Sequence, residues 1–210
     1  MKILQDDIHR ALPDLTAVIL AGGQSSRFGE PKAFARVNNQ TLLDMALTLG
    51  SEISSQRMLI LKEKPSADIP GVECYADVIK DCGPLAGIYT ALLHCNTTWA
   101  AILPCDMPML SAVVYHHLYS FRSTNRPVVA VSGFGLEPLV SIWPKKNCGM
   151  IGDMLMDGEY TLQTCMRELA AVHVKIPEAT SRLKPSIFSN VNFKDDLVKI
   201  NRTFKKELGS

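Results

Sequence analysis

The sequence predicts an α/β domain with a mainly parallel sheet. Short β-rich runs alternate along the chain with longer amphipathic stretches, which is the pattern of repeated strand–helix units. Two of the runs, at 16–20 and 100–103, are almost continuously apolar, as strands covered on both faces of a parallel sheet are. Hydrophobic residues make up 47% of the 210 residues and charged residues 20%, which is enough to bury one sizeable core. We therefore expect a single three-layer, Rossmann-like domain.

Each expected strand is a short apolar run bounded by glycine, proline or polar residues. The first run ends at Ala21-Gly22-Gly23, the run at 100–103 ends at Pro104, and the run at 72–75 is the weakest. The expected strands are 16–20, 58–61, 72–75, 100–103, 128–131, 139–143 and 172–176.

The stretches between these strands carry apolar residues at helical spacing. Thr41 is well placed to cap the first helix, and the second begins after Gly83-Pro84. The expected helices are 41–49, 85–94, 113–122, 150–156, 162–169 and 195–202. We expect the domain to cover 15–203, with an N-terminal extension at 1–14 and a polar C-terminal tail at 204–210.

The composition argues against nucleic-acid and membrane partners. Lysine and arginine total 22 against 21 acidic residues, so the net charge is +1 and no basic surface is expected. No apolar run reaches the roughly 20 residues that a spanning helix needs. Asp6 and Asp7 lie where a signal peptide would have its apolar core, so a cytoplasmic protein is expected. The six cysteines form no Cys-x-x-Cys pair and are expected to be free, mostly buried thiols.

The segment that follows the first strand has the composition of a phosphate-binding loop. In a parallel sheet the ligand lies beyond the carboxyl ends of the strands, where this segment begins. Gly22 and Gly23 allow the backbone N–H groups to approach a phosphate closely. Arg27 and Lys32 follow and supply charges that neutralise a triphosphate. The loop lacks the glycine spacing of a P-loop or of a dinucleotide-binding loop.

A second candidate is Asp106, which follows the strand at 100–103 in a loop with prolines on both sides. A carboxylate opposite a cationic phosphate loop suits Mg²⁺, which prefers one or two carboxylates together with phosphate oxygens. The alternative role, capping the next helix, falls better to Ser111. Asn192 either supplies a further oxygen near the metal or forms a turn before the last helix.

The order of these motifs resembles a known family. Leu-Ala-Gly-Gly-x-Ser-x-Arg-x-Gly-x-x-Lys at 20–32 resembles the opening motif of the nucleotidyltransferases that activate sugars, polyols and cofactors. Three further segments resemble the molybdenum cofactor guanylyltransferase branch, and the resemblance covers about 16–198. They are Gly83-Pro84-Leu85-Ala86-Gly87-Ile88 after Asp77, Pro104-Cys105-Asp106-Met107-Pro108, and Asn190-Val191-Asn192.

The resemblance implies a nucleotidyltransferase-type fold and transfer of GMP from GTP to molybdopterin, with or without molybdenum, in the presence of Mg²⁺. It implies Mg²⁺ at Asp106 and catalytic roles for Lys32, Arg27 and Asp106. Other proteins of cofactor biosynthesis and the recipient molybdoenzymes are the further partners implied. The implied nucleotide contacts are Leu20, Ala21, Gly22, Gly23, Lys32, Leu61, Asp77, Gly83, Leu85 and Asp106. Leu61 stands where the family often has asparagine.

The residue that reads the base is open between two aspartates. The carboxylate of Asp77 is suited to accept from N1–H and the 2-amino group of guanine, a donor pair that cytosine lacks. Asp81 competes for this role, because it lies nearer to Gly83. Three other functions are considered: a molybdopterin cytidylyltransferase, another small-molecule nucleotidyltransferase, and a nucleotide-binding protein that delivers the cofactor without catalysis.

Overall fold

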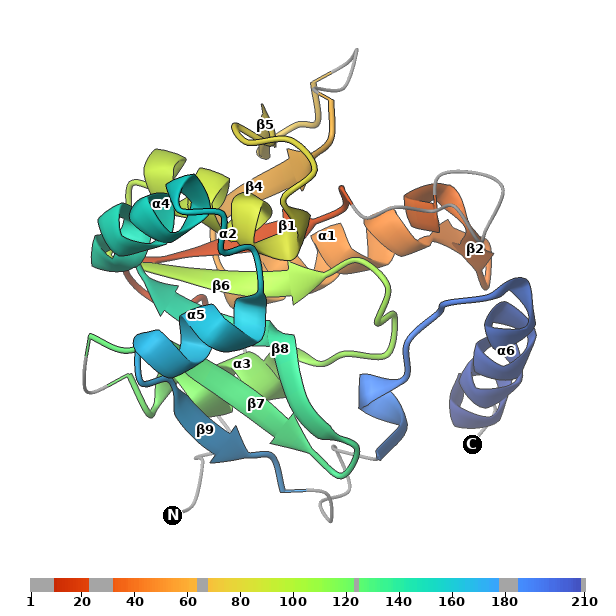
Figure 1. Cartoon of the computed structure of the whole chain (residues 1–210). Coiled ribbons are helices and arrows are strands. Elements are labelled where there is room, and N and C mark those ends of the chain that lie inside the picture. Colours follow the sequence, from red (N-terminus) through yellow and green to blue (C-terminus); the bar gives the residue numbers. More distant parts are fainter. Residues whose placement is uncertain (1–9, 23–31, 64–67, 123–124, 178–184, 209–210) are drawn as a thin grey trace.

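The computed structural model describes residues 10–22, 32–63, 68–122, 125–177 and 185–208 (Figure 1). Seven strands form one sheet in the order β5-β4-β1-β6-β8-β7-β9. Their bounds are β1 (Leu15–Leu20), β4 (Gln56–Leu61), β5 (Glu73–Ala76), β6 (Trp99–Pro104), β7 (Val128–Ser132), β8 (Gly135–Pro144) and β9 (Val172–Lys175). A two-residue hairpin, β2 (Arg36–Val37) and β3 (Gln40–Thr41), forms a separate small sheet.

The large sheet is parallel except for β8, which runs antiparallel to both β6 and β7. β8 reverses direction because it is joined to β7 by a tight turn at Ser132–Gly135. Its pairing with β7 is interrupted: Val129 pairs with Ser141, whereas Ala130 pairs with Glu137. The three residues between these β8 partners therefore form a bulge, and one of them is Pro138, which has no N–H to donate to a neighbouring strand.

Helices cover both faces of the sheet and give the three expected layers (Figure 1). One core packs α1 (Leu42–Ile53) and α3 (Ala112–Tyr119) against the sheet. The opposite core packs α2 (Gly83–His94), α4 (Cys148–Met156) and α5 (Leu162–Glu168). The remaining elements are η2 (Lys32–Phe34), η3 (Lys145–Asn147), η4 (Pro185–Phe188) and α6 (Lys194–Leu208). Because both faces are covered, the strand ends remain as the place for polar chemistry.

The local signals read from the sequence explain where two helices begin. Thr41 caps α1 through a complete capping box with Asp44, in which each side chain accepts the other residue's backbone N–H. Ser111 caps α3, since its hydroxyl accepts from the N–H of Val113. Both capping predictions are confirmed, and the capping of α3 by Ser111 leaves Asp106 available for another role.

Every strand and helix expected from the sequence is present, but several bounds differ and one hairpin is additional. The β2–β3 hairpin was not expected, because two-residue strands are too short to show an alternating pattern. β8 begins at Gly135 instead of 139, since Glu137 and Pro138 interrupt the apolar run. α6 continues past 202 to Leu208, into the segment expected as a polar tail.

Residues 10–14 are joined to the domain by backbone hydrogen bonds. Leu12 N–H donates to the carbonyl of Ile53 at 2.8 Å, and Trp99 N–H donates to the carbonyl of Asp14 at 3.3 Å. None of the six cysteines forms a disulfide bond. In the described part of the chain, no helix has both the length and the apolar character that crossing a membrane requires.

Candidate active site

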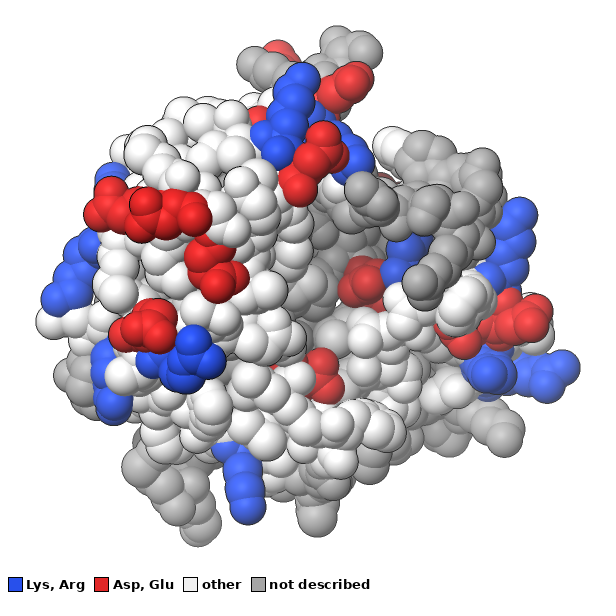
Figure 2. Space-filling model, viewed as in Figure 1, with Lys and Arg blue, Asp and Glu red and all other residues white. Residues whose placement is uncertain are grey.

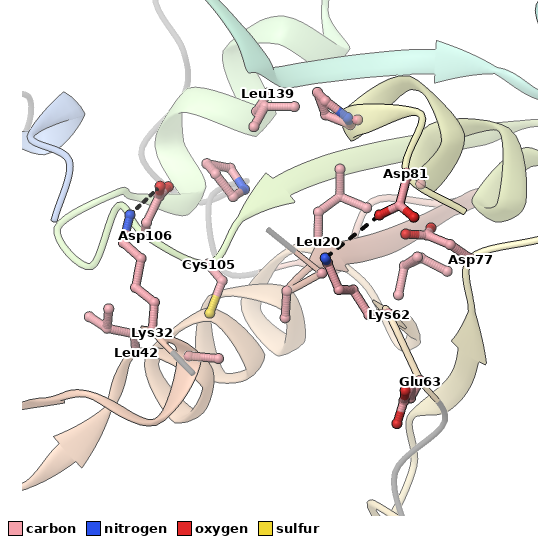
Figure 3. A pocket seen from close by; sticks show the side chains of 18 of the residues that line it. Leu20, Lys32, Leu42, Lys62, Glu63, Asp77, Asp81, Cys105, Asp106 and Leu139 are labelled. Atoms are coloured by element: carbon pink, nitrogen blue, oxygen red, sulfur yellow. Dashed lines mark hydrogen bonds and ion pairs between the residues drawn. The ribbon is translucent and has the colours of Figure 1, made fainter. Parts of the chain in front are cut away.

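A cavity of about 680 Å³ lies at the carboxyl ends of β1, β4, β5 and β6 (Figure 3). Adjacent parallel strands bring these ends to one edge of the sheet, although the four segments are far apart in the sequence. Gly22 follows β1, Lys62 follows β4, Asp77 follows β5 and Asp106 follows β6, and all four line the cavity. The structure thus brings these four residues together at the strand ends, where the sequence led us to expect the site.

At one end of the cavity a lysine donates hydrogen bonds to two side-chain oxygens. Lys32 Nζ, from η2, lies 2.8 Å from the carboxylate of Asp106 (Figure 3). It also lies 3.2 Å from the side-chain oxygen of Asn192. The N–H of Val191 donates to the carbonyl of Asp106 at 2.9 Å, which fixes the C-terminal segment beside the β6 loop. The lysine and the aspartate are only partly buried, so their charged groups remain accessible to a ligand.

The orientation of Asn192 follows from the way α6 begins. Asp196, in the first turn of α6, accepts the backbone N–H groups of Asn192 and Phe193, each at 2.9 Å. These hydrogen bonds hold the pKa of Asp196 below its usual value. Since Asp196 satisfies the helix start, the side chain of Asn192 is directed to Lys32 and does not form the alternative turn.

The other end of the cavity holds the carboxylate of Asp77. Its Oδ1 atom is buried and makes no hydrogen bond within the described residues. Burial raises the pKa of Asp77 to about 6, and the nearby ammonium of Lys62 opposes this rise. A buried carboxylate oxygen that lacks a hydrogen-bond donor carries a free-energy cost, which any group that donates to it would relieve.

Gly22 and Gly87 keep the space beside Asp77 open because they have no side chains. A Cβ atom at Gly22 would lie 3.3 Å from the backbone nitrogen of Lys62 and 3.4 Å from Asp77 Oδ2. A Cβ atom at Gly87, in α2, would lie 3.2 Å from the side chain of Leu20 and 3.5 Å from Asp77 Oδ1. Any larger residue at either position would fill the approach to the carboxylate.

Asp81, the competing acid, lies in a different setting. Its side chain is 78% exposed and 3.9 Å from Lys62 Nζ, a surface ion pair that is worth little. Its backbone has a positive φ of 60°, which belongs to the turn before α2. Of the two aspartates, Asp77 therefore has the desolvated carboxylate.

Three further residues expected at the nucleotide lie in different settings. Gly83 lines the cavity at the start of α2, with a φ of +66° that favours glycine. The side chain of Leu85 is fully buried in the core under α2, so any contact it makes to a ligand comes from its backbone. Leu61 lies between the lining residues Ile60 and Lys62, and its carbonyl accepts the N–H of Asp77 at 2.9 Å.

Two of the expected residues, Gly23 and Arg27, lie outside the described residues. Lys62 and Gly87 are among the cavity residues that were not expected from the sequence. Lys62 directly follows β4, so the rule that ligands lie at the carboxyl ends of parallel strands could have identified it. Gly87 belongs to the Gly-Pro-Leu-Ala-Gly motif, but its contact with Asp77 depends on the packing of α2 against β1.

The Lys32 end has the donor chemistry for a hard divalent cation. Asp106 offers a carboxylate and Asn192 an amide oxygen, both of which suit Mg²⁺. Among the described residues, no group of three or more His, Cys, Asp or Glu side chains is placed to hold a metal. Most of the ligands would therefore be phosphate oxygens and water, as Mg²⁺ accepts in nucleotide sites.

The fold and the lining of this cavity are those of a nucleotidyltransferase. Glycines line a cavity at the ends of parallel strands, with a lysine–aspartate pair at one end and the carboxylate of Asp77 at the other. Residues 17–174 match the MobA-like NTP transferase domain, and the chain belongs to that family. A probable molybdenum cofactor guanylyltransferase of Geobacillus sp. (strain WCH70) is 30% identical and aligns with 85% of this chain and 93% of its own length. A protein of the same description from Bacillus licheniformis is 32% identical, with 89% and 96% covered.

Solved structures share the fold. The molybdopterin-guanine dinucleotide biosynthesis protein A of Archaeoglobus fulgidus superposes with a TM-score of 0.76, covering 91% of this chain and 99% of that one at 20% identity. A nucleotidyl transferase from Methanothermobacter gives a TM-score of 0.68 at 16% identity, with 92% and 98% covered. At these identities the superpositions establish the α/β nucleotidyltransferase fold.

Proposed function

We propose that this protein transfers GMP from GTP to molybdopterin, with or without bound molybdenum, and releases pyrophosphate. The observation that carries the proposal is the carboxylate of Asp77, which lines the cavity and whose buried Oδ1 has no hydrogen-bond partner among the described residues. Guanine presents two adjacent donors, N1–H and the 2-amino group, whereas adenine and cytosine present an acceptor nitrogen at the corresponding position. The names of the relatives support the same acceptor and nucleotide.

The reaction needs no protein nucleophile. A terminal phosphate oxygen of the acceptor forms a bond to the α-phosphorus, the bond between the α-phosphorus and the bridging oxygen breaks, and pyrophosphate carries away the electron pair. The protein contributes positioning and charge. The Lys32 ammonium, held between Asp106 and Asn192, would stabilise the charge that develops at the α-phosphate.

The remaining groups bind the phosphates. The backbone at Ala21 and Gly22 lies at the cavity wall, where N–H groups are available to the β- and γ-phosphates. The sequence assigns Gly23 and Arg27 to the same phosphates. Asp106, with Asn192 beside it, would hold Mg²⁺. The ion would act as a Lewis acid on the phosphate oxygens.

A nucleotide panel tests the proposal. Pyrophosphate release is measured with molybdopterin as the acceptor, and kcat/KM is compared for GTP, ITP, ATP and CTP. ITP lacks only the 2-amino group, so the loss of one donor to Asp77 is expected to lower kcat/KM roughly tenfold to a hundredfold. ATP and CTP are expected to be poor substrates. A preference for CTP, or no turnover with any nucleotide, would contradict the proposed function.

A further inference from the structure

A second cavity, of about 510 Å³, adjoins the first at Asn192, which lines both. It lies between the turn of the β7–β8 hairpin and the segment from η4 to α6, which approach each other in Figure 1. Figure 2 shows the molecule from the same side, with a hollow at the centre of this face and charges of both signs around it. The volume is in the range of a site for a small organic molecule.

Glu137 is a buried acid in the wall of this cavity. Its side chain is only 9% exposed, and Oε1 accepts a hydrogen bond from the hydroxyl of Ser132 at 2.7 Å. Burial raises the pKa of Glu137, and the hydrogen bond from Ser132 opposes this rise. Among the described residues no cation pairs with this carboxylate, so the packing of the core does not explain why a glutamate stands here.

Residues at the bulge in β8 line different cavities. Leu139, inside the bulge, lines the first cavity, whereas Glu137, just before it, lines the second. One strand thus contributes to both cavities within three residues. The two cavities are therefore neighbours that share Asn192 and are both lined by β8.

Aromatic side chains border the second cavity. Phe134, in the hairpin turn, is 75% exposed, and Phe193, before α6, is 51% exposed, although both are large apolar groups. Exposed rings beside a buried hydrogen-bonding group are typical of a site for a flat heteroaromatic ligand, which they contact through its faces while the polar group reads its edge.

We propose that the second cavity binds the amino-pyrimidinone ring of the acceptor, and that the carboxylate of Glu137 accepts from the ring N–H and the neighbouring amino group. This inference rests on the proposed function for the identity of the acceptor as a pterin. The same pair of donors on guanine is assigned above to Asp77, so the two carboxylates would read the two halves of the product by the same chemistry.

The connection between the cavities agrees with the direction of transfer. Asn192 lies where they meet and contacts Lys32, 3.2 Å away. A ligand whose ring is held at Glu137 and whose phosphate extends toward Asn192 therefore presents that phosphate to the group assigned to the α-phosphate of GTP. This arrangement places both substrates without requiring either to leave its own cavity.

A binding experiment without turnover tests the inference. The probes are 6-hydroxymethylpterin and 6-hydroxymethyllumazine, which carries a carbonyl in place of the amino group. Binding is followed by ligand fluorescence with the full-length wild type, Glu137→Gln, and Glu52→Gln as a control at an exposed position of α1. GTP affinity with Mg²⁺ is measured on the same samples, and thermal melting verifies that each variant is folded.

The wild type and Glu52→Gln are expected to bind the pterin roughly tenfold to a hundredfold more tightly than the lumazine. Glu137→Gln is expected to lose most of this preference while its GTP affinity stays unchanged. Equal binding of the two probes by the wild type, or no binding of the pterin, would overturn the inference without the need for any variant. Failure of the wild type to bind GTP would instead contradict the proposed function. The pterin and lumazine affinities would still test the inference about Glu137.

Discussion

Asp77→Asn is expected to stabilise the protein while damaging its nucleotide selectivity. The substitution replaces a desolvated carboxylate with a neutral amide of nearly the same shape. Burial raises the pKa of Asp77 from 3.8 to about 6, a difference of about 2 units. At about 1.4 kcal/mol per unit, the charged form costs the native state about 3 kcal/mol. The side chain retains contact with solvent, so screening reduces the expected gain to about 1–2 kcal/mol.

The pH dependence gives the sign of the effect. The folded pKa lies above the unfolded value, so the ionised carboxylate destabilises the native state fully above about pH 6. As the pH falls from 6 toward 3.8, the native state takes up its proton before the unfolded chain does, and the penalty disappears. The stability advantage of Asp77→Asn is therefore expected to be largest at pH 8 and smaller at pH 5.

Urea unfolding of the nucleotide-free protein at pH 8 and pH 5 measures both quantities. Asp81→Asn is the matched control, because the side chain of Asp81 is 78% exposed and its change is expected to stay within about 0.5 kcal/mol. Added GTP is expected to stabilise the wild type more than Asp77→Asn. A folded Asp77→Asn that is less stable than the wild type at pH 8, or that gains the same amount at both pH values, would refute this reasoning.

Two further predictions concern the two ends of the cavity. Asp106→Ala is expected to lower pyrophosphate release by more than roughly a hundredfold, because Lys32 loses its partner at 2.8 Å and the proposed Mg²⁺ site loses its carboxylate. The melting curve of the variant is expected to show a folded protein. Wild-type turnover by the folded variant would contradict the assignment. Lys62→Met is expected to raise the pKa of Asp77 further, since the ammonium of Lys62 now lowers it. The GTP affinity, measured from pH 5 to 8.5, should then reach its maximum at a higher pH than in the wild type, and an unchanged profile would show that Lys62 does not act on Asp77.

Much of the fold was predictable because its signals are local. The apolar runs at β1 and β6, the cap at Thr41 and the glycine after β1 each depend on neighbours in the sequence. The rule that ligands lie at the carboxyl ends of parallel strands then located Gly22, Asp77 and Asp106 in one cavity. The family motifs added Gly83 and Leu85, and the structure shows that the side chain of Leu85 belongs to the core.

Only the tertiary structure decided which side chains meet and which are desolvated. Lys32 and Asn192 are 160 residues apart, and their contact exists because the C-terminal segment packs beside the β6 loop. The choice between Asp77 and Asp81 could not come from the sequence, because the two differ in burial and not in chemistry. The cavity beside Glu137 likewise exists only in the folded chain, because its other wall comes from the distant segment of η4 and α6. Local patterns determine where strands begin and end, whereas the free energy of a charge depends on every atom that replaces its water.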